Sequence, residues 1–142
     1  MDILFTNAKL IDPDARNIAT GALATKNGKI AAIITDNSTL PDAAQIIDCD
    51  RKYLAPGIVD IGVKVCEPGE RHKESFGTAG LAAAAGGVTT MVTRPDTDPA
   101  IDNPETLEFV IRRAREAAPV NVLPMAALTK GRQGRQMTEI GF

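Results

Sequence analysis

The sequence has only one histidine, His72, and two cysteines, Cys49 and Cys66, in 142 residues. A hydrolytic zinc site usually takes two or three imidazole ligands, so this chain alone cannot supply one. Two cysteines do not form a disulfide framework, and in the cytoplasm both would stay reduced. The composition therefore argues against a self-contained zinc hydrolase and against a fold stabilised by disulfides.

Long apolar runs and an excess of charge are missing as well. Apolar runs such as residues 81–85 fall far short of the ~20 residues that span a bilayer. The amino terminus has no basic region followed by an apolar run, so it does not indicate a signal peptide. A net charge of −2 gives no electrostatic reason to expect nucleic acid or an anionic membrane as a partner. These features favour a cytoplasmic protein.

The remaining composition fits a folded domain, with 44% apolar residues for a core and too few charges for disorder. Residues 2–11 alternate apolar and polar side chains, which predicts a strand. Residues 23–34 predict a hairpin, because Asn27-Gly28 supplies the positive φ angles of a tight turn. Residues 45–48 predict a further short strand. We therefore predict a small all-β module over residues 1–54.

The hydrophobic period changes after Pro56, where strands and helices begin to alternate. In chain order we predict strand 58–65, helix 76–86, strand 88–93, a helix from residue 104 and strand 120–126. Asn103 followed by Pro104 is a strong helix start, because the amide side chain caps and proline suits the first turn. Alternating strands and helices with short links predict a parallel α/β unit over residues 55–142.

Four motifs in this second part belong to one pattern. Residues 56–69 read Pro-Gly-Ile-Val-Asp-Ile-Gly-Val-Lys-Val-Cys-Glu-Pro-Gly. The others are Ala85-Gly86-Gly87-Val88-Thr89-Thr90, Arg94-Pro95-Asp96-Thr97 and Leu128-Thr129-Lys130-Gly131. In this order and spacing the chain resembles the N-terminal part of dihydroorotases and related cyclic amidohydrolases. The resemblance implies an α/β fold: the N-terminal portion of an amidohydrolase (β/α)₈ barrel, truncated near its third strand and preceded by a small β-sandwich segment.

The first motif departs from the family at the positions that carry chemistry. In the family it reads Pro-Gly-x-x-Asp-x-His-x-His-x-Arg-Glu-Pro-Gly, where the histidines hold zinc and the arginine holds the substrate carboxylate. Gly62 and Lys64 stand in place of the histidines, and Cys66 in place of the arginine. Asp96 replaces an asparagine that helps to bind the same carboxylate. The resemblance thus implies a degenerate pocket, with no catalytic residue and no metal ligand expected in this chain.

The residues of this pocket allow different interpretations. Lys64 either fills the vacated zinc position with its ammonium group or is a structural lysine in a salt bridge, and Asp96 is its expected partner. Cys66 is interpreted as a small buried apolar residue rather than a reactive thiol. Gly62 is interpreted as a glycine that permits close packing. Asp60 keeps the family identity, and we expect it to make a hydrogen bond at the strand end rather than to bind metal.

Charged residues outside the pocket are expected on the surface. His72 lies in a charged segment and is interpreted as a surface residue. Three arginines are expected on the solvated side of the second helix: Arg112, Arg113 and Arg115. A second basic cluster either meets an acidic partner or forms a flexible loop: Lys130, Arg132 and Arg135.

Three functions follow as hypotheses. The first is a dihydroorotase-like protein of pyrimidine biosynthesis that has no metal and no hydrolytic activity. The resemblance to inactive homologues makes it a structural partner of aspartate carbamoyltransferase. The second is an active zinc-dependent amidohydrolase, acting on dihydroorotate, a hydantoin or allantoin, with its other ligands beyond residue 142. The third is an independent small binding module.

The open barrel bears on these alternatives. Three strands leave a bare sheet edge and an apolar inner face. We therefore interpret the chain as the N-terminal part of a longer protein, marginally stable or self-associating unless other strands or another chain complete it.

Overall fold

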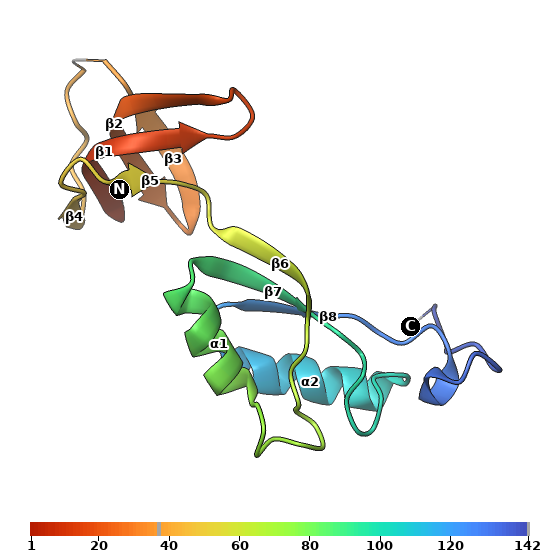
Figure 1. Cartoon of the computed structure of the whole chain (residues 1–142). Coiled ribbons are helices and arrows are strands. Elements are labelled where there is room, and N and C mark those ends of the chain that lie inside the picture. Colours follow the sequence, from red (N-terminus) through yellow and green to blue (C-terminus); the bar gives the residue numbers. More distant parts are fainter. Residues whose placement is uncertain (37, 142) are drawn as a thin grey trace. The chain divides into compact units, whose positions relative to one another are not determined.

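The computed structural model describes residues 1–36 and 38–141, which form two compact units that divide after Pro56 (Figure 1). The first unit is a five-stranded sheet in the order β3-β2-β1-β4, with β5 also paired to β1. Its strands are β1 (Ile3–Asp12), β2 (Asn17–Lys26), β3 (Lys29–Ile34), β4 (Gln45–Asp48) and β5 (Tyr53–Leu54). The all-β character predicted for this part of the chain is confirmed.

The hairpin between β2 and β3 has the turn that its sequence predicts. Asn27 and Gly28 have φ angles of 53° and 71°, as a two-residue turn with left-handed backbone requires. On the buried face, Leu4, Ala22 and Ala24 form a small core. Small side chains at two of these three positions allow little apolar burial in this unit.

The second unit is a three-stranded parallel sheet in the order β6-β7-β8, with two helices between the strands. Its elements are β6 (Ile58–Val63), α1 (Phe76–Ala85), β7 (Val88–Thr93), α2 (Pro104–Ala117), β8 (Asn121–Pro124) and a short 3₁₀ helix η1 (Lys130–Arg132). The predicted alternation of strands and helices is confirmed. Two strands are shorter than predicted: β6 ends at Val63 after an irregular pairing at Gly62, and β8 ends at Pro124, which has no N–H for the ladder.

Both helices end where local chemistry dictates. Ser75 and Thr78 form a capping box at the start of α1, and Gly86 follows its last residue. At the start of α2, the Asn103 side chain accepts the Thr106 N–H at 2.8 Å, and Pro104 occupies the first turn. These caps, made by adjacent residues, mark the starts of both helices and the end of α1.

The helices cover one face of the sheet and leave the other bare (Figure 1). Met91 of β7 packs with Phe76 of α1 and Val110 of α2 in the core of this unit. Side chains alternate along a strand, so the residues before and after Met91, and their partners on β6 and β8, point to the opposite face. That face displays exposed apolar side chains from both edge strands: Val59, Ile61 and Leu123. An uncovered apolar face of this kind is what an incomplete barrel leaves.

Among the described residues, no helix has both the length and the apolar composition to cross a bilayer. Cys49 and Cys66 are both free thiols.

Candidate functional site

Most residues singled out by the sequence lie where the parallel strands end, whereas Asp60 lies within β6. The Arg94 N–H donates to the Val63 carbonyl at 2.9 Å, and the Met125 N–H donates to the Thr93 carbonyl at 2.9 Å. These bonds carry the sheet pairing just past the last residues of β6 and β7. The segments that follow the three strands therefore leave from one edge, the carboxyl edge where barrels of this kind keep their sites.

An ion cluster around Asp96 occupies this edge. Lys64 Nζ lies 3.4 Å from Asp96 Oδ2, and Arg94 donates to the same oxygen at 2.9 Å. The pairing expected between Lys64 and Asp96 is confirmed. The Asp96 side chain is only 8% exposed, whereas the two cations are about half exposed. The buried carboxylate is thus held by two cations that reach in from the surface.

Two buried polar atoms at this edge have no hydrogen-bond partner among the described residues: Asp96 Oδ1 and Thr93 Oγ1. Arg94 was not among the expected pocket residues, although it stands beside Asp96 in the Arg-Pro-Asp-Thr motif. Arg94 is the first residue of that motif, two residues before Asp96. This short spacing could have identified it as a second cation for the Asp96 carboxylate.

Gly62 has a φ of +101°, a backbone conformation that L side chains rarely adopt. Apart from Gly62 and its two chain neighbours, no described residue has an atom within 4 Å of the position that a Cβ would take. The close packing expected at Gly62 is therefore wrong, because space is open there. The sheet register shifts between Ile61 and Val63, so Gly62 is the bulged residue of β6. Its backbone geometry, and not crowding, is what makes glycine suitable.

The other expected pocket residues have less defined surroundings. Cys66 is half-buried, between a core residue and a reactive surface thiol in exposure. Asp60 is exposed and in register with Met91, and its side chain makes no hydrogen bond or ion pair within residues 1–36 and 38–141. The strand-end bond expected for Asp60 is thus not formed there. His72 is exposed, as predicted.

The donor set at this edge does not fit the zinc that the family implies. No group of three or more histidine, cysteine, aspartate or glutamate side chains in the described part of the chain could hold a metal ion. At the two histidine positions stand a glycine without a side chain and a lysine engaged with Asp96. A protonated amine has no lone pair to donate, and it repels a dication.

Glu67 ties the segment after β6 to both helices. Its Oε1 accepts from Arg113 Nε of α2 at 2.7 Å, and its Oε2 accepts the Phe76 N–H at the start of α1 at 3.0 Å. Arg71 adds a weaker contact at 3.5 Å. The expectation that Arg113 lies on the solvated side of α2 is wrong, because it turns inward to this buried carboxylate. Arg112 and Arg115 are exposed as expected.

These contacts change the acidity of Glu67. Burial alone would raise the pKa of this carboxyl group, but the hydrogen bonds from Arg113 and the Phe76 amide outweigh it and lower the pKa below 4.5. Glu67 is therefore ionised at neutral pH, and its role is to hold three elements together.

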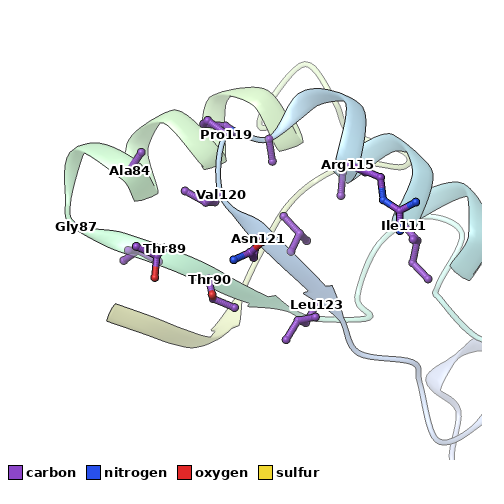
Figure 2. Close-up of a pocket in the computed structure, with 14 residues that line it drawn as sticks. Ala84, Gly87, Thr89, Thr90, Ile111, Arg115, Pro119, Val120, Asn121 and Leu123 are labelled. Carbon is purple, nitrogen blue, oxygen red and sulfur yellow. The ribbon is translucent and has the colours of Figure 1, made fainter. Parts of the chain in front are cut away.

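A hollow of about 890 Å³ lies away from this edge, beside β8 and α2 (Figure 2). It is bordered by the end of α1, by Gly87 and Thr89 around the start of β7, and by Pro119 and Val120 just before β8. Ile111 and Arg115 of α2 form its other side. The hollow lies along the outer edge of strand β8, near the amino ends of the strands. It is therefore an open side of the sheet, and it is separate from the site at the carboxyl edge.

Comparison with known proteins agrees with this architecture. Residues 51–142 match the family model described as dihydro-orotase-like. The chain belongs to the dihydroorotase-like family. Over 139 residues it is 41% identical to the dihydroorotase of Bacillus cytotoxicus and 42% identical to that of Bacillus thuringiensis strain Al Hakam. In both cases 98% of this chain matches 32% of the relative, so the chain spans about a third of their length.

A solved hydantoinase structure has the same fold as this dihydroorotase-like chain. The L-hydantoinase of Arthrobacter aurescens superimposes with a TM-score of 0.80 at 26% identity, over 90% of this chain and 28% of that one. The expected fold class is therefore confirmed: an α/β chain that forms the N-terminal portion of an amidohydrolase barrel, preceded by a β segment.

Proposed function

We propose that this chain is the N-terminal part of a dihydroorotase-like protein that has given up zinc-dependent hydrolysis. The observation that carries the proposal is the Lys64–Asp96 ion pair, which puts an ammonium group at a position where the family motif has a zinc ligand. Gly62 removes the second ligand of that motif. Loss of two ligands on one strand is a severe defect, since a catalytic zinc usually has three protein ligands.

In this proposal the protein acts in the cytoplasm as a structural partner of aspartate carbamoyltransferase in pyrimidine biosynthesis. Its similarity to dihydroorotases supports the pathway, and a homologue without activity can be retained for assembly. The uncovered apolar face of β6, β7 and β8 supports completion by further barrel strands, because an isolated apolar face of this kind is costly in water.

The test uses the full-length protein purified without chelators, with the dihydroorotase of Bacillus cytotoxicus as a matched positive control. We expect substoichiometric zinc by mass spectrometry and no turnover of dihydroorotate above background, while the control shows both. Co-purification followed by intact mass would identify bound carbamoyltransferase. Stoichiometric zinc together with turnover would overturn the loss of hydrolysis.

The second candidate is an active cyclic amidohydrolase that takes its ligands from the longer protein. The structural similarity to an L-hydantoinase favours it. The same purified protein, assayed with hydantoin and allantoin with added zinc, would distinguish the two, because only the second candidate predicts metal-dependent ring opening.

A further inference from the structure

Basic charge at the carboxyl edge is concentrated on one segment. The basic loop, residues 129–137 after β8, carries three exposed cations: Lys130, Arg132 and Arg135. The segment after β6 balances its cations with glutamates, and the one after β7 has more aspartates than arginines. In a chain with a net charge of −2, this local excess stands out.

The basic loop is held in one shape by hydrogen bonds. Thr129 and Met137 form an antiparallel bridge, and the Lys130 N–H donates to the Gln136 carbonyl at 2.9 Å. The Gly134 N–H donates to Thr129 Oγ1 at 3.0 Å. The Gly131 N–H donates to Asp102 Oδ2 at 2.6 Å, which anchors the loop beside the start of α2. A simple flexible loop is therefore a poor description of this segment.

The cations of the basic loop are not used inside the described part of the chain, where none of the ion pairs involves them. Exposed apolar side chains flank them: Leu128, Met137 and Ile140. Arginine and methionine beside aliphatic side chains are typical of protein interfaces. A preformed loop also loses little conformational entropy on binding.

We infer that the basic loop is a docking surface for an acidic patch on a partner protein. The inference rests on the proposed role as a structural partner and names the surface and the charge of what it meets. Charge complementarity selects an acidic occupant, and the apolar flank selects protein over nucleic acid, which binds chiefly through many phosphate contacts. Since the loop follows β8, the partner would sit at the carboxyl edge.

The first experiment measures the affinity of the full-length protein for the aspartate carbamoyltransferase of the same organism. The test variant combines Lys130→Glu with Arg135→Glu. The control combines Lys26→Glu with Lys29→Glu, which makes the same change of charge beside another exposed turn. We expect Kd to rise about tenfold or more in the test variant with a weaker salt dependence, and to stay within about twofold in the control.

The second experiment uses immobilised poly-L-glutamate as the probe and needs no carbamoyltransferase. The wild type and the control variant should be retained in a salt-dependent way, and the loop variant should elute early. If carbamoyltransferase fails to bind but this retention depends on the loop, the proposed partner is wrong and the acidic-docking surface stands. Equal retention of both variants, or tighter binding of duplex DNA than of polyglutamate at equal salt, would overturn the inference.

Discussion

Position 62 shows how one residue can set the backbone geometry of a strand. Gly62 adopts a φ of +101° in a bulge of β6. A histidine, like most residues with a side chain, would be strained in this backbone conformation. Two residues further on, the Lys64 ammonium faces Asp96, whose carboxylate is also held by Arg94. Each substitution suits its neighbours, so the ion cluster is self-consistent without a metal.

Replacing Gly62 by alanine should destabilise the full-length protein by about 1–2 kcal/mol, because a Cβ disfavours left-handed backbone. Gly77→Ala is the matched control, since Gly77 lies in α1 and, outside its chain neighbours and its own helix backbone, the nearest atoms are 3.7 Å from the added Cβ. Alanine is a better helix former, so that change should be neutral or stabilising by up to about 1 kcal/mol. Chemical denaturation measures both. A Gly62→Ala protein as stable as the wild type would contradict the assigned backbone conformation.

On the scale of elements, Glu67 joins the segment after β6 to α1 and α2. The Glu-Pro-Gly sequence is a family landmark, and in this structure its glutamate has a structural use that needs no catalysis. One buried carboxylate satisfies an amide at the first turn of α1 and a guanidinium from α2. This connection holds the segment after β6 to both helices without using the pocket residues.

Glu67→Gln should lower the free energy of unfolding by about 2 kcal/mol, because it weakens two hydrogen bonds to a charged group in a buried place. Glu116→Gln is the control: Glu116 also lies near Arg113, at 3.9 Å, but its side chain is exposed. Its substitution should change stability by less than about 0.5 kcal/mol. Thermal and urea unfolding of the full-length variants would measure the difference, and equal effects would refute the bridging role of Glu67.

The same carboxylate makes stability depend on acid. Because folding lowers the pKa of Glu67 below 4.5, the unfolded chain binds the proton more readily. The stabilisation is present above the ordinary pKa and is lost as the pH falls through the lowered one. Unfolding measured from neutral pH to about pH 3 should show a smaller loss of stability in Glu67→Gln than in the wild type. Parallel curves for the two proteins would contradict this origin.

At the scale of the whole molecule, the main feature is the parallel sheet. It has one uncovered apolar face, and its edge strands are β6 and β8. Ile61 is 73% exposed and Leu123 57% exposed, one on each edge strand of the parallel sheet. Relatives about three times as long have room for further strands. Each compact unit buries only a small core. We therefore expect other strands to pack on the uncovered face of the parallel sheet.

Residues 1–142 produced alone should therefore associate with rising concentration and bind a hydrophobic dye. Ile61→Lys combined with Leu123→Lys should reduce both effects, because charges on a bare apolar face oppose stacking. Light scattering after size exclusion measures the association. As a control, Ile18→Lys changes an exposed isoleucine in the amino-terminal sheet and should leave association through the parallel sheet intact. A monomeric 142-residue chain with cooperative unfolding would favour an independent module instead.

The features that followed from the sequence are those that neighbouring residues control. Asn27-Gly28 made the hairpin turn, Asn103-Pro104 began α2, and Gly86 ended α1, because caps and turns depend on a few adjacent side chains. Family spacing also located the strand-end positions, including Lys64 and Asp96. Their ion pair could be anticipated, since opposite charges at the ends of adjacent parallel strands come close.

Other features depend on contacts between segments far apart in the chain. Arg113 belongs to a basic run that looks solvated along its helix, but Glu67, forty-six residues earlier, draws it inward. The positive φ of Gly62 depends on how β6 pairs with β7, and the shape of the basic loop depends on Asp102. Local propensity fixes where elements begin and end. Packing brings distant charges together, and only the folded chain reveals which of them meet.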